Sequence, residues 1–395
     1  MKTNTTIKRE NGNDIKIFAK TIEDSALAQI KQLGEFEAYR DSKIRIMPDC
    51  HAGSGCTIGT TMTINDKITP NLVGVDIGCG MLTIRLAEKD IDLNKLDRVI
   101  NNKIPHGFDI HTKQKADFDF SKLIAKGLNL ERARLSLGTL GGGNHFIEVG
   151  KDSKDCLYLV IHSGSRNIGA QVAKCYQDLA ISDGENKHKI LSAILITKLK
   201  REGREKEIDT ELKKINTDFN KDLAYLVSEN FRNYVNDMAI MQKYASTNRF
   251  TMANIILQEM GLRADMLFET MHNYIDFSRG ILRKGAISAE RGEKLLIPIN
   301  MRDGSIIGIG KGNADWNYSA PHGAGRLMGR KEAMRNLQID EFKEQMKDIY
   351  STSVLPSTLD EAPNAYKPME EILECVKDTI DIIDIIKPIY NFKAH

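Results

Sequence analysis

Residues that could carry out chemistry occur in short glycine-rich segments, and these segments are spread from Asp49 to His322. No internal repeat, low-complexity stretch or Pro/Ser-rich linker divides the chain between them. If one site uses all of these residues, the chain must fold as one unit wrapped around that site. We therefore expect residues 1–395 to form a single domain, although a chain of 395 residues could hold two or three domains of average size.

Runs of β-type residues broken by glycine predict a substantial β-sheet component. The expected strands are Asp14–Phe18, Ile44–Met47, Thr57–Ile64, Leu72–Val75, Met81–Leu86, Tyr158–Ile161, Leu295–Pro298 and Ser305–Ile309. An amphipathic helical stretch is expected to run to about Gly34. The predicted fold class is α+β: a single mixed domain with central β-sheets around the active site and a helical insertion near residues 170–280.

The helical insertion is predicted from residues 204–260, which contain neither Gly nor Pro and are rich in Leu, Ile, Ala, Lys and Glu. Two or three helices fit this length. The mixed charge run Lys198–Lys214 is typical of a solvated helix face, with an RNA-binding patch as the alternative. A last helix is expected over Met369–Ile386, with Pro388 after it as a stop.

The composition is that of an ordinary globular protein, with 41% hydrophobic, 28% charged and 6% aromatic residues. No run of 18 or more apolar residues predicts a membrane span, and the polar start of the chain has no apolar core typical of a secretory signal. The six scattered cysteines are therefore expected to be reduced thiols, some of which could bind metal, in a cytoplasmic protein. A formal charge of +2 excludes a polycation but not a local basic groove.

Three glycine-rich segments each carry a histidine. They are Gly138–Glu148 with His145, His162–Arg166, and His322–Arg326. Successive exposed backbone N–H groups in such segments can form an anion-binding concavity, and the forked side chains of Arg166 and Arg326 match the geometry of phosphate. One such loop alone is better explained as a tight turn, but three of them together favour a phosphate-containing ligand.

A second set of residues has the chemistry of metal ligands. It consists of Asp76, Cys79, His145, His162 and His272. Each histidine alone could be a hydrogen-bonded structural residue. A mixed oxygen, nitrogen and sulfur set suits Mn, Fe, Co or Zn rather than Mg or Ca. Five ligands are one more than a closed tetrahedral zinc site holds, whereas two ions bridged by the thiolate would use all five.

His322 is left over from this set. It stands between Pro321 and the segment Gly323–Arg326, where it would face whatever that loop binds. Its role could be that of a general base, a further metal ligand, or a nucleophile that attacks a phosphoryl group.

Several blocks of the sequence together resemble the RNA-splicing ligase RtcB family over nearly the whole chain. The blocks are Met47–His51, Gly74–Gly80, Leu137–Val149, Val160–Gly169, His272–Asn273, Arg283–Ala286, Pro321–Arg326 and Asp360–Lys367. The resemblance implies an enzyme that joins an RNA 3′-phosphate or 2′,3′-cyclic phosphate to a 5′-hydroxyl, using GTP and two Mn²⁺ ions. The expected partners are thus RNA and GTP, and we expect a monomer that does not bind membranes.

The resemblance also implies roles for individual residues. Asp76, Cys79, His145, His162 and His272 match manganese ligands, and His322 matches the histidine that becomes guanylylated. Residues expected around GTP are Asn144, His145, Phe146, Ile147, Glu148, Asn273, Asn300, Ser305, His322, Gly323, Ala324, Gly325 and Lys393, with Phe146 and Glu148 at the guanine. Arg166 and Arg326 are expected to bind RNA or phosphate.

The chain departs from the common family pattern at a few positions. Ile299–Met301 stands where the family usually has Gly-Ser-Met, and Ala394 and His395 follow Lys393 where a terminal glycine is usual. Cys50, Cys56 and Gly107–His111 also differ. These departures concern substrate choice and guanine preference, and they suggest a shorter, divergent bacterial-type member used in RNA repair rather than in tRNA splicing.

Two other functions fit parts of the same pattern. A metal-dependent phosphoesterase or cyclic-phosphate hydrolase could use the same ligands, but it would not need a nucleotide pocket. A catalytically silent protein that binds RNA ends would not need five ligands together with His322.

Overall fold

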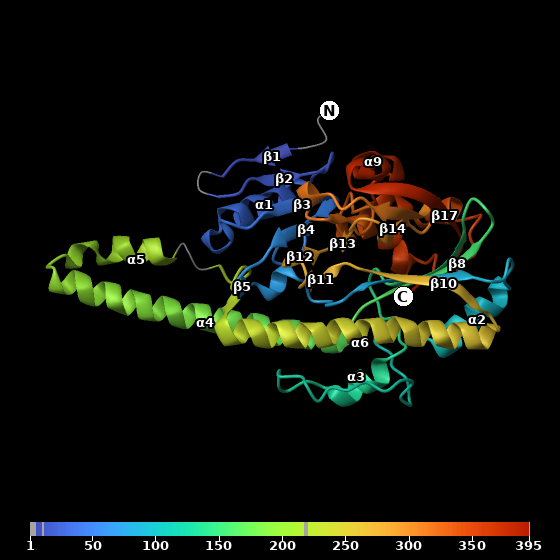
Figure 1. The fold of residues 1–395 in the computed structure, drawn as a ribbon, viewed down its shortest axis with the longest axis horizontal. Coiled ribbons are helices and arrows are strands. Elements are labelled where there is room, and N and C mark those ends of the chain that lie inside the picture. The colour runs from blue at the N-terminus through green and yellow to red at the C-terminus, as the bar shows by residue number, and fades with distance from the viewer. Residues whose placement is uncertain (1–4, 10–11, 217–219, 395) are drawn as a thin grey trace.

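The computed structural model describes residues 5–9, 12–216 and 220–394, apart from the side chains of residues 215 and 216. Two β-sheets make up the body of the fold, and long helices run along one side of it (Figure 1). This arrangement confirms the predicted mixed α+β class. In the described part of the chain, no helix is both long enough and apolar enough to cross a membrane.

The larger sheet has seven antiparallel strands in the order β10-β6-β8-β7-β17-β15-β14. They are β6 (Gly80–Leu86), β7 (Phe146–Lys151), β8 (Leu157–Ser163), β10 (Ala264–Met271), β14 (Lys294–Asn300), β15 (Gly304–Gly310) and β17 (Ile380–Lys393). The register pairs Met81 and Phe146 with His162 and pairs Met271 with Gly80. The start of β6, the start of β7 and the ends of β8 and β10 therefore meet at one end of the sheet.

The second sheet has six strands in the order β1-β2-β3-β4-β12-β11, and only β2 and β3 are parallel. They are β1 (Thr5–Ile7), β2 (Ile15–Ile17), β3 (Ile44–His51), β4 (Ile58–Thr63), β11 (Asn273–Asp276) and β12 (Ile281–Lys284). Two small antiparallel pairs complete the strands: β5 (Lys67–Ile68) with β9 (Leu226–Val227), and β13 (Ala286–Ser288) with β16 (Ser319–Pro321).

Two long helices, α4 (Arg166–Arg201) and α6 (Ser228–Met260), lie along the sheets. The apolar side chains Tyr234 and Met241 of α6 pack into a core with the six-stranded sheet. Further along α6, Met252 and Ile256 pack into a second core with the seven-stranded sheet. One helix thus joins the two cores. The other helices are α1 (Asp24–Glu35), α2 (Leu93–Lys103), α3 (Leu130–Ser136), α5 (Ile208–Asn216), α7 (Arg330–Asn336), α8 (Ile339–Gln345) and α9 (Met369–Cys375).

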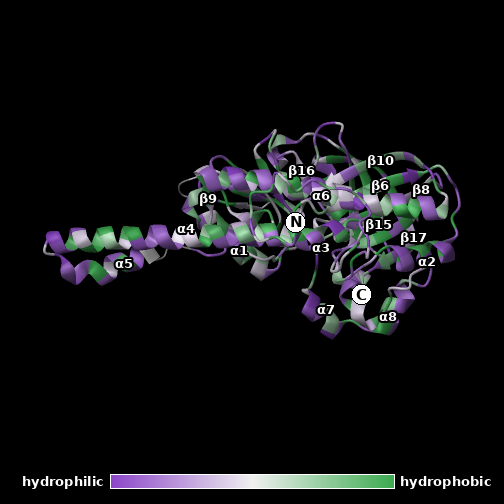
Figure 2. Ribbon diagram, turned by 90° about the horizontal axis from the view of Figure 1, so that it is seen from below, coloured by the Kyte–Doolittle hydropathy of each residue, from purple (hydrophilic) through white to green (hydrophobic). Residues whose placement is uncertain are grey.

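The second half of α4 and the helix α5 project from the body as an arm (Figures 1 and 2). Most side chains of Lys198–Lys214 on this arm are exposed, as expected for a solvated charged face. The helical insertion is confirmed by α4, α5 and α6, but its predicted end is wrong, because β10, β11 and β12 lie between residues 264 and 284.

Two other secondary-structure predictions are wrong. Leu72–Val75 is not a strand: a 3₁₀ turn over Pro70–Leu72 precedes Asp76, and its apolar side chains are buried without belonging to a sheet. The predicted helix Met369–Ile386 ends as α9 at Cys375, and β17 begins at Ile380. The five isoleucines between residues 380 and 386 favour a strand. Pro388 lies inside β17 at a register shift, where a proline is tolerated.

Candidate active site

One end of the seven-stranded sheet gathers the five predicted metal ligands. Cys79 directly precedes β6, His145 precedes β7, His162 lies near the end of β8, and His272 follows β10. Asp76 lies in the turn that leads to Cys79. Residues almost 200 positions apart along the chain thus become neighbours because four antiparallel strands end together.

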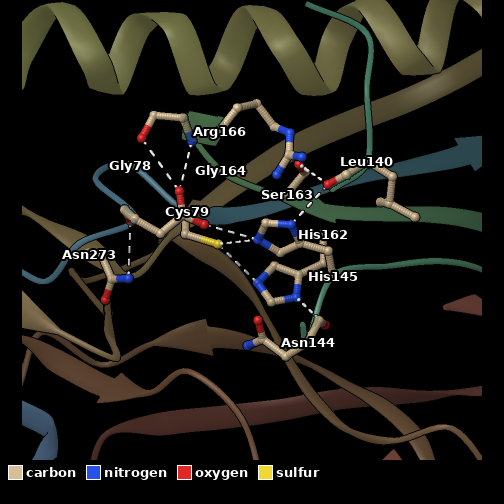
Figure 3. A network of polar contacts seen from close by, with 12 residues as sticks. Gly78, Cys79, Leu140, Asn144, His145, His162, Ser163, Gly164, Arg166 and Asn273 are labelled. Atoms are coloured by element: carbon tan, nitrogen blue, oxygen red, sulfur yellow. Dashed lines mark hydrogen bonds and ion pairs between the residues drawn. The ribbon is translucent and has the colours of Figure 1, made fainter. Parts of the chain in front are cut away.

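The other four side chains lie around Cys79, and Figure 3 shows His145 and His162 beside its sulfur. Its sulfur lies 3.4 Å from Nε2 of His145 and 3.3 Å from Nε2 of His162. Nε2 of His145 lies 3.0 Å from Asp76 Oδ2, and Nε2 of His162 lies 3.0 Å from Nε2 of His272. Two groups of potential ligands result, Asp76–Cys79–His145 and Cys79–His162–His272, and they share the sulfur.

Backbone carbonyls fix the orientation of two of the imidazoles. Nδ1 of His145 donates to the carbonyl of Leu140 (2.9 Å), and Nδ1 of His162 donates to that of Asn144 (3.1 Å). Because a carbonyl can only accept, Nδ1 of each ring carries a proton, and a neutral ring then presents the Nε2 lone pair to the cluster. Several lone pairs that face one another in a buried space fit a cation between them.

Burial controls the charge of the cluster. It lowers the pKa values of His162 and His272 well below their usual range and raises the pKa of the Cys79 thiol. Burial alone would also raise the pKa of Asp76, but the hydrogen bond from His145 and the charges of His145 and Arg166 hold it at about 2. Burial therefore favours neutral imidazoles at His162 and His272 beside the Asp76 carboxylate, and a bound cation would favour the Cys79 thiolate.

Two buried residues of α6 hold the loops that carry these ligands. The side chain of Asn248 accepts from the amides of Gly138 and Thr139 and donates to the carbonyl of Thr139 and to the hydroxyl of Ser163. Arg249 donates to the carbonyls of Gly78 (2.9 Å) and Ser163 (2.7 Å) and pairs with Glu269. One helical turn thereby ties together three loops of the site.

Two glycines allow close approaches in the same loops. A Cβ atom at Gly164 would overlap the carboxylate of Asp76, and one at Gly141 would overlap the guanidinium of Arg166. Arg166 donates to the hydroxyl of Thr139 (3.1 Å) and the carbonyl of Gly107 (3.3 Å). Its guanidinium therefore braces the glycine-rich loop beside Asp76.

His322 joins the site from the other side of the molecule. It follows β16, and its Nδ1 lies 2.6 Å from Oδ2 of Asp49 on β3, which also accepts from the His322 backbone amide (2.9 Å). A carboxylate can only accept, so Nδ1 carries the proton and Nε2 is the nitrogen not engaged with Asp49. The rings of His322 and His272 lie 4.6 Å apart, centroid to centroid. Gly325 permits this arrangement, because a Cβ there would overlap the Asp49 backbone.

A cavity of about 680 Å³ opens next to His322. Of the residues expected around GTP or phosphate, those that line it are Asn144, Phe146, Glu148, Asn300, His322, Gly323, Ala324, Gly325, Arg326 and Lys393, together with the metal-ligand candidate His162. The lining does not include His145, Ile147, Asn273, Ser305 or Arg166. Ile147 packs into the core on the other face of β7, and Ser305 is fully buried on β15.

Two residues of the expected GTP set have structural contacts within the protein. Asn273 donates to the carbonyl of Asp76 and accepts from the amide of Gly285. Asn300 does line the cavity, but its side chain binds the backbone amides of Arg302 and Asp303 and the Asp303 carboxylate. The side chain that replaces the usual serine therefore closes a turn.

Glu148 is a buried carboxyl group on the wall of the cavity. Burial raises its pKa to about 8, against the lowering effect of the hydrogen bond from Asn391 (2.8 Å). Glu148 Oε1 and Asn391 Oδ1 have no hydrogen-bond partner among the described residues. Unsatisfied buried acceptors are costly, so this wall is built for a ligand that donates hydrogen bonds.

A compact ion-pair network includes four residues that line the cavity, Arg326, Arg330, Tyr366 and Lys393. Glu361 pairs with Lys393, Arg326 and Arg330, and the hydroxyl of Tyr366 donates to it (2.7 Å). Burial alone would raise the pKa of Glu361, but the three cations hold it at about 2. The Lys393 ammonium also lies 5.5 Å from the centre of the Phe146 ring.

The sequence analysis did not assign a role of their own to several residues of the site. Asp49 and His51 were noted only within a matching block, although a buried aspartate in a strand is a signal in itself. The polar residues Asn248 and Arg249 share a helix face with Tyr244, Ala245 and Met252, and this spacing indicates that they are buried. Glu361 gave no such signal, because its partners come from three separate segments.

Comparison with known proteins shows relatives along nearly the whole chain. The profile of the family described as tRNA-splicing ligase RtcB matches residues 29–131 and 126–394. RNA-splicing ligase RtcB of Escherichia coli (strain K12) is 29% identical, over 89% of this chain and 90% of that protein. RNA-splicing ligase RtcB1 of a second E. coli strain (ATCC 25922) is 30% identical over the same shares. tRNA-splicing ligase RtcB of Aeropyrum pernix is 25% identical, over 91% of this chain and 89% of that protein.

These relatives are RNA ligases by name, and the similarity over nearly the whole chain assigns this protein to that class of enzyme. The chain belongs to the RtcB family. The family resemblance and the expectation of an RNA ligase enzyme are thereby confirmed.

Proposed function

We propose that the protein joins RNA 3′-phosphate or 2′,3′-cyclic phosphate ends to 5′-hydroxyl ends, using GTP and two Mn²⁺ ions, with His322 as the guanylylated nucleophile. The observation that carries this proposal is the position of His322. Its Nδ1 is bound to the buried Asp49, and the side chain lies between the ligand cluster and the cavity.

The ligand set fits two ions that share the Cys79 thiolate, with Asp76 and His145 on one ion and His162 and His272 on the other. Imidazole and thiolate ligands favour Mn²⁺ over Mg²⁺, which prefers oxygen and keeps its waters. When bound, the ions would act as Lewis acids toward phosphate oxygens.

The cavity fits GTP because of its acceptors and its glycine loop. The guanine N1–H and N2–H₂ groups are donors that could satisfy Glu148 Oε1 and Asn391 Oδ1, whereas adenine lacks this pair. Phe146 offers an apolar face, and the Gly323–Gly325 loop lies beside His322 for the phosphates.

The reaction then has three steps after any cyclic phosphate has been opened by water. His322 Nε2 attacks the α-phosphorus of GTP, which forms a P–N bond and releases pyrophosphate. An oxygen of the RNA 3′-phosphate attacks the same phosphorus and breaks the P–N bond, so that GMP is transferred to the RNA. The 5′-hydroxyl attacks the 3′-phosphate, and GMP leaves.

Asp49 has a defined part in the first step. As the P–N bond forms, the imidazole becomes positively charged, and the carboxylate on Nδ1 stabilises that charge and keeps Nε2 aimed at phosphorus. A hydrolase on the same ligands would need neither this histidine nor the acceptors of Glu148 and Asn391, so the ligase is favoured.

The test is incubation with α-labelled GTP and Mn²⁺, followed by denaturing electrophoresis. We expect a GMP adduct that is labile in acid and stable in alkali, as a P–N bond should be. His322→Ala should form no adduct, and Asp49→Asn should form it much more slowly. Labelling by ATP to the same extent would refute the guanine site.

The remaining expectations concern the RNA substrate, the location and the oligomeric state rather than the chemistry. Action on broken RNA rather than on spliced tRNA, a cytoplasmic location and a monomeric state stay predictions, and so do phosphate or RNA contacts by Arg166 and Arg326. In the structure both guanidinium groups already bind protein groups, which makes positioning of the loops a further role for them.

A further inference from the structure

Phe108 is 94% exposed, more than the other large hydrophobic side chains among the described residues. It lies in the turn His106–His111, a segment that departs from the usual family pattern. A single exposed apolar residue is ordinary, but a ring with almost no intramolecular contact does not contribute to the core.

The turn is fastened to the glycine-rich loop of the active site. The amide of Gly107 donates to the carbonyl of Gly141 (2.9 Å), and the carbonyl of Gly107 accepts from Arg166. Arg166 lies beside the carboxylate of Asp76. Phe108 is thus next to a residue that is fixed against the metal-ligand loops, rather than in a remote part of the surface.

The surroundings of Phe108 suit a polyanion. Arg132 donates to the carbonyl of Phe108 (2.6 Å), and its positive charge adds to the lowering of the Arg166 pKa that burial causes. Lys113 and Lys115 are exposed in the same segment, and Asp109 is the adjacent acidic residue.

The glycine loop beside this turn is open. Among the described residues, a Cβ at Gly143 would meet nothing within 4 Å, and one at Gly142 would meet only Gly107 Cα, at 3.8 Å. Neither amide donates a backbone hydrogen bond to another described residue. Successive unengaged N–H groups can bind an anionic oxygen.

The ligand cluster can be reached from this side. The side chain of Asp76 is 28% exposed and the preceding Val75 is 56% exposed, although neither lines the cavity beside His322. If GTP occupies that cavity, an RNA strand needs another approach to the same cluster. The Asp76 side, flanked by the Gly141–Gly143 loop, offers one.

We propose that Phe108 stacks against a base of single-stranded RNA close to the ligation junction, while Arg132 and the amides of Gly142 and Gly143 hold a neighbouring phosphate. This inference rests on the proposed ligase function. Stacking on an aromatic side chain accepts any base, and its loss weakens binding by about 5- to 100-fold.

Binding is measured by fluorescence anisotropy with a short single-stranded RNA that ends in a 3′-phosphate, in the presence of Mn²⁺. Phe108→Ala should weaken binding within the stated range, and Phe108→Trp should restore it. Phe277→Ala is the matched control, since Phe277 is 48% exposed in the β11–β12 turn. It should bind RNA as the unaltered protein does.

An abasic substitution, moved one position at a time along the RNA, identifies the stacked base. At one position near the end, the unaltered protein should lose affinity to the level of Phe108→Ala, whereas Phe108→Ala should lose little more. Equal losses for both proteins at every position would overturn the proposal.

Phe108→Leu distinguishes stacking on RNA from a merely apolar contact. If leucine restores RNA binding as well as tryptophan does, the contact is merely apolar and the proposal is wrong. Adduct formation with GTP is measured in the same samples, because it reports on the proposed function alone. Normal labelling combined with unchanged RNA affinity in Phe108→Ala would reject the RNA subsite and leave the ligase chemistry intact.

Discussion

The ligand cluster and the nucleotide cavity lie side by side, yet different forces hold them. The cluster is held by hydrogen bonds to backbone groups, with Asn248, Arg166 and Arg249 among the donors, and burial favours the neutral forms of His162 and His272. The cavity is held by charges, with Glu361 paired to three cations. The cluster is thus arranged to bind a cation, whereas the charged side chains of the ion-pair network in the cavity are already paired with one another.

This difference explains which residues carry unsatisfied groups. In the cluster, the lone pairs that face one another would bind a cation. In the cavity, Glu148 and Asn391 carry buried acceptors that have no partner among the described residues, on the wall where we place guanine. Metal removal should therefore disrupt the cluster, while changes in the cavity should alter nucleotide choice and the pH dependence of stability.

The largest effect is expected from Cys79→Ser. Loss of an outer partner of a metal ligand alone costs about 10- to 100-fold in metal affinity, so loss of a bridging thiolate should cost more than about 100-fold. Titration with Mn²⁺ followed by calorimetry measures this, and ligation should fall in parallel. The half-buried Cys175→Ser serves as the control and should bind normally. Full activity of Cys79→Ser with Mg²⁺ alone would contradict the assignment.

Arg249→Met should produce the next largest effect, on stability. It removes a buried guanidinium from two carbonyls and from Glu269, and breaking such a pair costs about 3–5 kcal/mol. The free energy of unfolding is obtained from urea denaturation. Arg85→Met, which breaks an exposed pair with Asp265, should leave the midpoint where it is. Equal midpoints for both variants would show that α6 does not hold the loops.

Glu148→Gln tests the cavity wall. In the folded protein without nucleotide, the Glu148 pKa is raised from 4.5 to about 8, so the folded state keeps a proton that the unfolded chain releases. The contribution of Glu148 to the free energy of unfolding is largest below about pH 4.5 and is lost as the pH rises toward 8. The glutamine variant should therefore gain stability over the unaltered protein as the pH rises, by about 1–3 kcal/mol, and lose GTP labelling.

The control for that experiment is Glu332→Gln at the exposed mouth of the cavity. It should show no gain that depends on pH in thermal or urea unfolding. A gain of the same size in both variants would mean that burial of Glu148 is not the cause.

The smallest effect is expected on the arm. Lys198→Gln combined with Lys200→Gln removes two exposed charges far along α4, and RNA affinity should change by less than about twofold, since exposed charges there are screened by salt. A large loss of RNA affinity would favour the alternative that Lys198–Lys214 binds RNA.

The sequence was informative wherever chemistry was carried by rare residue types in short blocks. Asp76, Cys79 and the three histidines meet as expected, because glycines permit the tight approaches and the strands end together. The same blocks could not reveal Glu361, whose role depends on cations from distant segments.

Local patterns failed where tertiary packing decided the outcome. The isoleucine-rich segment after residue 380 was expected to be helical, yet it completes the seven-stranded sheet between β7 and β15. Its last residues bring Asn391 and Lys393 to the cavity, so the strand is also part of the site.

The central claim is that His322 serves only as the acceptor of GMP from GTP, whereas the ligand cluster serves the joining step. The most direct test supplies His322→Ala with Mn²⁺, an RNA whose 3′-phosphate already carries GMP, and a 5′-hydroxyl RNA. Our account predicts that this variant joins the two RNAs while it remains unable to join an unmodified 3′-phosphate RNA with GTP. Failure to join the activated RNA, or normal adduct formation with GTP, would contradict it.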